Sequence, residues 1–230
     1  MLEIFKEGET IDLCIPTQEF ALKSEWYNWF NKTEITKYLY QGQRKNTPES
    51  QLEFFKNIPK DRLVFIMQTK NHIPNGVISF SKIDLKKKSA DWAIVKDNSI
   101  EPELRGISAL ESVALLIEYG FEKLGLKRIS ASQHTDLKKW QTRLELLGFK
   151  LEGIHENRFV KGNEIANEQT ISCQYSDYIN IKKHRNGKIW DSKIKMLERI
   201  KKIHKENFNE LMNKFFKEQR ENYYNKIFFL

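Results

Sequence analysis

Alternation of polar and apolar side chains marks the first part of the chain as a set of β-strands. Residues 10–16 alternate with the period of a half-buried strand. Residues 62–69 and 76–84 are two further apolar-rich runs, separated by a turn-forming Pro-Asn-Gly sequence. Another such run follows at residues 90–95. The pattern therefore predicts antiparallel strands in this region.

Apolar residues that recur every three or four positions predict four helices. The second helix opens with Thr47 and Pro48, which is an N-cap followed by a proline at the first helical position. The third helix is followed by Gly125, a residue that commonly ends helices. We expect helices at residues 19–30, 47–57, 108–124 and 136–147, and further strands at residues 128–133, 150–159 and 168–178.

The pattern changes at about Lys188, where a polar segment at residues 182–187 gives way to a longer periodic stretch. Its apolar positions predict one long amphipathic helix, and they are Trp190, Ile194, Leu197, Ile200, His204, Phe208, Leu211 and Phe215. We therefore expect a domain at residues 1–180 and a basic, amphipathic helical extension at residues 181–230. The order of elements in the domain predicts an α+β fold with a mostly antiparallel sheet.

The composition excludes several classes of protein. With 40% hydrophobic and 30% charged residues the chain is neither disordered nor fibrous. No apolar run approaches the roughly 18 to 20 residues that cross a bilayer, and the first residues lack the features of a secretory signal. Cys14 and Cys173 are too few for a disulfide framework and lack the spacing of metal ligands. We therefore expect a soluble, cytoplasmic protein without a metal ion.

The net charge of +8 lies entirely in residues 181–230, because residues 1–180 are neutral in sum. Nucleic acid is therefore not expected as a partner of the main body. Three interpretations of the extension remain. Its apolar stripe packs on the body or on a second copy in a homodimer, or the helix binds an anionic membrane or acidic partner, or it binds nucleic acid, for which no motif is present.

Several segments resemble one known family of enzymes. They are residues 115–129 (LLIEYGFEKLGLKRI), 144–153 (LELLGFKLEG), 8–13 (GETIDL) and 29–38 (WFNKTEITKY). Together they are similar to the GNAT N-acetyltransferases over about residues 8–178, in the branch that contains the ribosomal-protein acetyltransferases. The resemblance implies the GNAT fold, a mixed and mostly antiparallel sheet flanked by helices, and acetyl-CoA as the acetyl donor.

A narrower resemblance points to the aminosugar N-acetyltransferases of bacterial nonulosonic-acid pathways, such as the pseudaminic-acid enzyme. The segments that carry it are residues 76–84 (GVISFSKID), residues 96–98 (KDN) and residues 106–111 (GISALE). This second resemblance implies an amino-sugar nucleotide as the acceptor.

The GNAT resemblance also implies where CoA binds. In the family, backbone N–H groups at a loop that enters a helix bind the CoA diphosphate. The loop aligns with residues 103–109 here, which makes Leu104, Arg105, Gly106, Ile107, Ser108 and Ala109 the expected contacts. Glu103 and Ser108 depart from the family's Gln/Arg-x-x-Gly-x-Gly/Ala pattern, whereas Gly106 still permits close approach of the backbone.

The helix at residues 136–147 departs further from the family. The family's usual asparagine and serine fall at Leu137 and Trp140, and the tyrosine that many members use as a general acid falls at Leu144. The customary acid therefore has no counterpart at these positions. Either another group supplies the proton or water protonates the thiolate, which is a good leaving group.

Acetyl transfer needs a base for the amine and a donor for the oxyanion. The resemblance implies a backbone N–H donor at the splayed end of the fourth strand, which is around Ile94 and Val95. For the base we consider Asp91 on that strand and His134 after the next strand. The alternative for Asp91 is a salt-bridged carboxylate, and the alternative for His134 is a structural loop histidine.

The loop between the first helices commonly forms the acceptor wall in this family. Tyr38, Tyr40, Gln41, Gln43 and Arg44 offer aromatic faces, amides and a cation, a mixture that suits a sugar nucleotide. A helix-capping or surface role for the loop is the alternative.

We therefore expect an N-acetyltransferase that moves an acetyl group from acetyl-CoA to the primary amine of a small acceptor. The expected acceptor is an amino-sugar nucleotide of bacterial surface-glycan biosynthesis, and transfer is direct within a ternary complex. Two alternatives remain, namely a protein N-terminal or ribosomal-protein acetyltransferase and a GNAT-like binding protein without catalysis.

Overall fold

A single sheet organises the computed structural model, which describes residues 2–97, 104–203 and 208–229, with the backbone alone for Arg105. The strands are β1 (Glu3–Lys6), β2 (Ile11–Ile15), β3 (Leu63–Thr69), β4 (Pro74–Asp84), β5 (Ser89–Lys96), β6 (Arg128–His134), β7 (Phe149–Lys161) and β8 (Glu164–Gln174). Their order in space is β1-β2-β3-β4-β5-β6-β8-β7. β5 and β6 run parallel, and the other neighbouring pairs run antiparallel, so the predicted mixed, mostly antiparallel sheet is confirmed.

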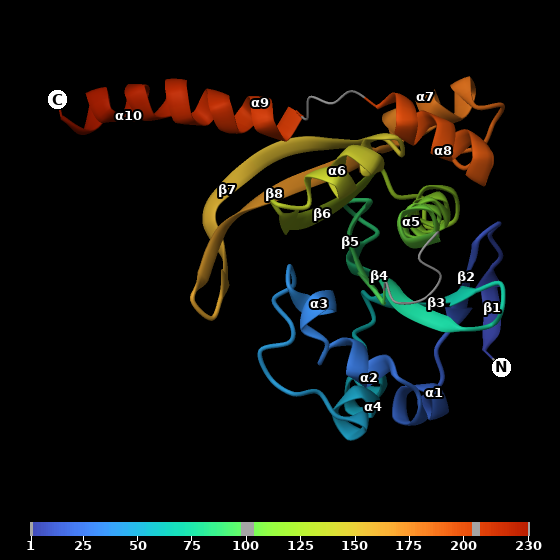
Figure 1. Cartoon of the computed structure of the whole chain (residues 1–230). Helices are drawn as coiled ribbons and strands as arrows, with labels where there is room; N and C mark the ends of the chain where they lie inside the picture. The colour runs from blue at the N-terminus through green and yellow to red at the C-terminus, as the bar shows by residue number, and fades with distance from the viewer. Residues whose placement is uncertain (1, 98–103, 204–207, 230) are drawn as a thin grey trace.

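Helices cover both faces of this sheet (Figure 1). The helices are α1 (Gln18–Lys23), α2 (Trp26–Trp29), α3 (Thr33–Thr36), α4 (Pro48–Lys56), α5 (Arg105–Glu122), α6 (Lys138–Glu145), α7 (Tyr175–His184), α8 (Lys193–Lys202), α9 (Phe208–Phe215), the π-helical turn η2 (Phe216–Arg220) and α10 (Glu221–Phe228). Helices α1 to α4 lie on one face, and α5 lies on the other.

The sheet separates two hydrophobic clusters, because alternate residues of a strand point to opposite faces. On β5, Ala90 and Trp92 pack in the cluster under α5, whereas Val95 packs in the cluster under α1 to α4. The α5 cluster also contains fully buried Leu144 of α6 and Met196 of α8. The helix α8, from the basic extension, therefore packs on the same core as α5.

Side-chain caps begin α4 and α8, and the first of these caps was predicted from the sequence. Thr47 Oγ1 accepts the backbone N–H of Ser50 at 3.2 Å, and Pro48 occupies the first turn of α4. Ser192 Oγ accepts the N–H of Lys195 at 3.2 Å and caps α8 in the same way. Each cap satisfies an N–H group that has no partner within its own helix.

The strands β5 and β6 pair over a short distance and then part. Their ladder begins with Ser89 opposite Arg128 and ends with Asp91 opposite Ser130. β5 continues beside β4 as far as Lys96. Among the described residues, the other edge of β5 has no ladder partner beyond Asp91. Residues 92–96 therefore present an open backbone edge at the centre of the sheet.

Two sequence-based helix and strand boundaries are wrong. The helix expected at residues 19–30 is two helices, because Ser24 is extended (φ −91°, ψ 174°) and its Oγ accepts the N–H of Trp26 at 3.2 Å. The strand expected at residues 168–178 ends at Gln174, where α7 begins. The spacing of Tyr175 and Tyr178 is helical, and both rings pack on Phe121, with centroids 5.8 and 4.8 Å away.

The long helix expected from Lys188 is also interrupted. α8 ends before Ile203, whose backbone is extended (ψ 137°), and the predicted stripe residue His204 lies outside the described residues. Residues 208–228 then form the 21-residue C-terminal helix, which lies beside the β7–β8 hairpin (Figure 1). Asn209 is buried against Gln169, whereas Phe215 is 54% exposed. A homodimer through this exposed side of the helix stays a prediction.

Candidate active site

A cavity of about 570 Å³ lies on the face of the sheet that α1 to α4 cover. Its floor is the middle of β3, β4 and β5, including Ser79, Ala93 and Val95. Its walls are the loop at residues 39–46, one side of α4, and the residues Trp26, Phe30 and Arg62. Because residues 93–95 belong to the open edge of β5, the cavity borders the place where β5 and β6 part.

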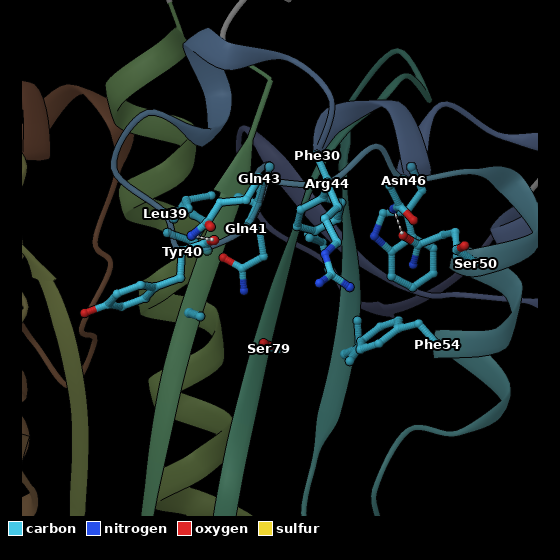
Figure 2. Close-up of a pocket in the computed structure, with 18 of the residues that line it drawn as sticks. Phe30, Leu39, Tyr40, Gln41, Gln43, Arg44, Asn46, Ser50, Phe54 and Ser79 are labelled. Carbon is cyan, nitrogen blue, oxygen red and sulfur yellow. Dashed lines mark hydrogen bonds between the residues drawn. The ribbon is translucent and has the colours of Figure 1, made fainter. Parts of the chain in front are cut away.

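Four of the five predicted acceptor residues line this cavity. They are Tyr40, Gln41, Gln43 and Arg44. The amide of Gln41 and the guanidinium of Arg44 point into the space above the strands, whereas the ring of Tyr40 turns to the side (Figure 2). Tyr38 does not line the cavity, and its ring packs on His134 with the centroids 4.8 Å apart.

The loop is fixed at its C-terminal end by two asparagines. Asn31 Nδ2 donates to the carbonyl oxygen of Asn46 at 2.9 Å, and Asn46 N–H donates to Asn31 Oδ1 at 2.7 Å. Asn46 Nδ2 also donates to Gln51 Oε1 on α4 at 3.0 Å. Gly42 has φ +83°, and a Cβ there would collide with Thr36, so the loop requires glycine at that turn.

The other end of the loop is fixed to the β7–β8 hairpin. The hydroxyl of Tyr40 donates to the carboxylate of Glu168, and burial together with this bond raises the pKa of Tyr40 to about 12. Lys161 Nζ donates to the carbonyl oxygens of Thr36 at 2.6 Å and Gln41 at 2.7 Å. Residues far apart in the sequence therefore hold the loop wall of the cavity, at residues 39–46, in place.

The cavity is electropositive. Its charged lining residues are Arg44, Lys45 and Arg62, and none of the described lining residues is a carboxylate. The guanidinium carbon of Arg62 lies 5.2 Å from the centroid of the Phe54 ring, and burial lowers the pKa of Arg62. Sequence reasoning did not identify Arg62, because a single arginine before a strand is usually a surface cation.

Asp91 lies on the same face of β5 as Ala93 and Val95, because the three residues alternate along the strand. It is outside the cavity lining, one step beyond Ala93. Its side chain is 39% exposed, and a carboxylate oxygen lies 2.9 Å from Lys82 Nζ. Both the base role and the ion-pair role that the sequence suggests are compatible with this position.

His134 is buried at 2% exposure between the rings of Tyr38 and Phe159. Its Nδ1 accepts the backbone N–H of Asp136 at 3.0 Å, and its Nε2 lies 3.4 Å from a carboxylate oxygen of Glu164. The Nδ1 lone pair is therefore already engaged, which places the proton of the neutral ring on Nε2. His134 can act as a base only after it releases that amide.

The predicted CoA loop meets two cations that sequence reasoning missed. Lys96 Nζ donates to Ser108 Oγ, which in turn donates to the carbonyl oxygen of Leu104 at 2.7 Å. A Cβ added at Gly106 would collide with the guanidinium of Arg143 from α6, so glycine is what lets that side chain reach α5. The described side chains of Ile107, Ser108 and Ala109 are buried, so their contribution to a ligand site is the backbone. Glu103 and the side chain of Arg105 lie outside the described residues.

The first turn of α5 fits the diphosphate of CoA, because it presents backbone donors and lies next to two cations. Its free backbone N–H groups and the positive end of its dipole favour an anion, and Arg143 and Lys96 add two positive side chains. By contrast, Leu144, at the position of the family's acid, is fully buried in the α5 cluster. No general acid is supplied from that position.

The sequence matches the family model of the acetyltransferase (GNAT) domain over residues 21–150. This match spans more than half of the chain, and the chain belongs to the GNAT acetyltransferase family. It is an acetyl-CoA-dependent N-acetyltransferase with the α+β GNAT fold that the sequence resemblance implied. No curated protein sequence matches the chain significantly.

Solved structures with the same fold have low sequence identity to this chain. A GNAT-family acetyltransferase from Bacillus anthracis is 19% identical, with a TM-score of 0.61 over 74% of this chain and 98% of that one. The microcin C7 self-immunity acetyltransferase MccE, solved with acetyl-CoA and AMP, is 22% identical, with a TM-score of 0.60 over 73% and 93%. A spermidine N-acetyltransferase from Vibrio cholerae is 17% identical, with a TM-score of 0.64 over 75% and 98%.

None of the described helices is long and apolar enough to cross a membrane. Within the same part of the chain, His, Cys, Asp and Glu side chains do not gather in groups of three or more that could hold a metal ion.

Proposed function

We propose that this enzyme acetylates the primary amine of a small, phosphorylated acceptor, namely an amino-sugar nucleotide of bacterial surface-glycan biosynthesis. The observation that carries the proposal is the charge of the cavity beside the open edge of β5, where Arg44, Lys45 and Arg62 line the walls. None of the described lining residues is a carboxylate that would balance them. Cations favour phosphate, and amides such as Gln41 suit sugar hydroxyl groups.

The same charge argues against a polyamine acceptor. A cationic polyamine in this cavity would meet three positive side chains and would gain no opposite charge from the lining. The related fold of MccE was solved with acetyl-CoA and AMP together, which supports a nucleotide as a partner of this kind of site. The proposed substrate class therefore differs from that named for the spermidine enzyme, despite the shared fold.

Direct transfer follows from the surroundings of the two cysteines. Cys14 and Cys173 are both buried and outside the cavity lining. Burial raises the pKa of Cys14 to about 11 and that of Cys173 to about 12, so neither is a ready thiolate nucleophile. We therefore propose that the acceptor amine attacks the thioester carbonyl itself and that CoA leaves as the thiolate.

The open edge of β5 and Asp91 supply the remaining chemistry in this proposal. Backbone N–H groups around Ile94 and Val95 border the cavity and would stabilise the oxyanion. Asp91, on the same face one step from Ala93, would take the proton of the amine through a water molecule. The thiolate needs no protein acid, because it is a good leaving group.

The test is thiol release from acetyl-CoA with matched acceptors and the full chain. We expect a 4-amino-sugar nucleotide to show kcat/KM at least about tenfold above that of the same amino sugar without its nucleotide, because each charged hydrogen bond to phosphate adds binding energy. Spermidine and a peptide with a free N-terminus serve as the other acceptors. Equal or better turnover of either one would contradict the proposed acceptor class.

The base is tested by Asp91→Asn beside His134→Gln. We expect Asp91→Asn to lower kcat on the order of a hundredfold, which is the usual contribution of a general base. His134→Gln should leave kcat within a few-fold, because Nδ1 of His134 is already occupied by the Asp136 amide. The opposite ranking in steady-state kinetics would assign the base to His134.

A further inference from the structure

Three buried N–H groups without a hydrogen-bond partner lie in the wall of the same cavity. They are Nε1 of Trp26, Nε2 of Gln51 and Nε of Arg62. Trp26 is 1% exposed and Gln51 is 3% exposed, so neither side chain is a surface group. A buried donor without a partner costs roughly 1–3 kcal/mol, so such groups are rare in folded proteins and usually have a specific cause.

Two of these side chains contact the ring of Phe54, and the third is on the same helix as Phe54. The Trp26 ring meets the Phe54 ring edge-on with centroids 6.1 Å apart. The Arg62 guanidinium lies over the same ring at 5.2 Å. Gln51 precedes Phe54 by three residues on α4, which places both side chains on one face of that helix. Trp26, Gln51 and Arg62 therefore all lie near Phe54, a lining residue that is 36% exposed.

Buried acceptors without a hydrogen-bond partner are absent from the described lining of the cavity. The described cavity lining contains no buried side-chain oxygen without a partner, because Gln51 Oε1 already accepts from Asn46. The three groups without a partner are all donors, so only hydrogen-bond acceptors can satisfy them. One of these donors belongs to the cation Arg62. Oxygen atoms of a phosphate satisfy several N–H donors at once and neutralise a guanidinium, which a neutral hydroxyl group or an amine does not.

We propose that Trp26, Gln51 and Arg62 form the subsite that binds the phosphate of the acceptor, with the adjoining ring of Phe54 beside it. This inference rests on the proposed acceptor class and adds an orientation to it. The phosphate lies at the α4 end of the cavity, and the amine lies at the open edge of β5. Arg62 is the residue that determines the preference for a phosphorylated acceptor.

The test is calorimetric titration of the full chain with UDP, ADP, uridine and inorganic phosphate, without acetyl-CoA. We expect UDP or ADP to bind and uridine to bind at least about tenfold more weakly. Arg62→Gln should weaken binding of the nucleoside diphosphate by about 10- to 100-fold, since a charged hydrogen bond and its Coulomb attraction are lost together. Arg62→Lys should restore part of the affinity, because it restores the charge.

Two further variants separate binding from folding. Trp26→Phe keeps an aromatic ring and removes only the donor, so we expect a several-fold loss of nucleotide affinity. Lys60→Gln is the matched control, because Lys60 is an exposed cation two residues from Arg62 and outside the cavity lining. Thermal melting without ligand should be similar for Arg62→Gln and the parent chain, because Arg62 forms no ion pair among the described residues.

Two outcomes would overturn the subsite, and a third would overturn only the proposed acceptor. Equal nucleotide affinity for the parent chain and Arg62→Gln would mean that ordered water satisfies the donors. Uridine binding as tightly as UDP would mean that the donors bind the base instead. Binding of inorganic phosphate with turnover of a simple amino-sugar phosphate would retain the subsite and reject the nucleotide acceptor, so the two proposals fail separately.

Discussion

Arg143 illustrates how a single side chain can compensate for a changed motif. It projects from α6 onto Gly106 in the first turn of α5 and has no ion-pair partner among the described residues. A lone cation at the positive end of a helix is repelled by the helix dipole, whereas an anion between them is attracted by both. The arrangement therefore favours a bound anion, and we propose that the diphosphate of acetyl-CoA is this anion.

The prediction at this residue is that Arg143→Gln weakens binding of CoA by about 10- to 100-fold, because a charge-assisted contact to the diphosphate is lost. Binding of pantetheine, which lacks the diphosphate, should not change. Both affinities are measured by calorimetry on the full chain, and Lys139→Gln on the exposed side of α6 is the control. An equal loss of CoA and pantetheine affinity would show that Arg143 only supports the fold.

At the scale of elements, one ion pair joins the last turn of α8 to the residue that precedes its N-cap. Asp191, which precedes the N-cap of α8, accepts hydrogen bonds from Arg199 Nη1 at 2.7 Å and Nη2 at 2.6 Å. The Asp191 side chain is only 10% exposed, and these bonds hold the pKa of Asp191 below its usual value of 3.8. A carboxyl group whose pKa is lower in the folded chain than in the unfolded chain stabilises the fold at pH values above the unfolded pKa. That contribution is lost as the pH falls below 3.8.

We expect Asp191→Asn to lower the free energy of unfolding by about 1–3 kcal/mol at pH 7, the range for hydrogen bonds to charged groups. The difference from the parent chain should shrink at pH 3, because the unfolded chain then binds a proton at Asp191 and part of the stabilisation is lost. Urea denaturation at the two pH values measures it. Glu19→Gln, which removes an exposed pair with Lys23, should change stability little at either pH. A difference that stays constant with pH would argue against the ion pair.

Elements with a strong local pattern could be predicted from the sequence, and those set by distant contacts could not. The strands around residues 62–69 and 76–84 and the capped start of α4 follow from alternation and from Thr47-Pro48. The helix α7 was not predicted, because the surface on which Tyr175 and Tyr178 pack is Phe121 of α5, which is distant in the sequence. The break at Ser24 depends on one hydrogen bond to Trp26 that leaves no periodic trace.

At the scale of the whole molecule, the sequence indicated one wall of the cavity but not the N–H groups that we propose for the phosphate subsite. The polar loop was recognisable as a wall because Tyr40, Gln41, Gln43 and Arg44 are consecutive or nearly so. The donors Trp26, Gln51 and Arg62 come from three separate elements, and only folding brings them around Phe54. Arg143 reaches Gly106 across 37 positions of the sequence, and neither residue alone suggests the contact.

The contacts between residues 36–41 and the β7–β8 hairpin have a consequence for folding during synthesis. Every residue that lines the cavity lies within the first 95 positions, but Lys161 and Glu168, which hold residues 36–41, come much later. A nascent chain that has left the ribosome only as far as β6 contains all the described lining residues, but it lacks Lys161 and Glu168. The contacts that hold residues 36–41 in place can therefore form only near the end of translation, when β7 and β8 have emerged.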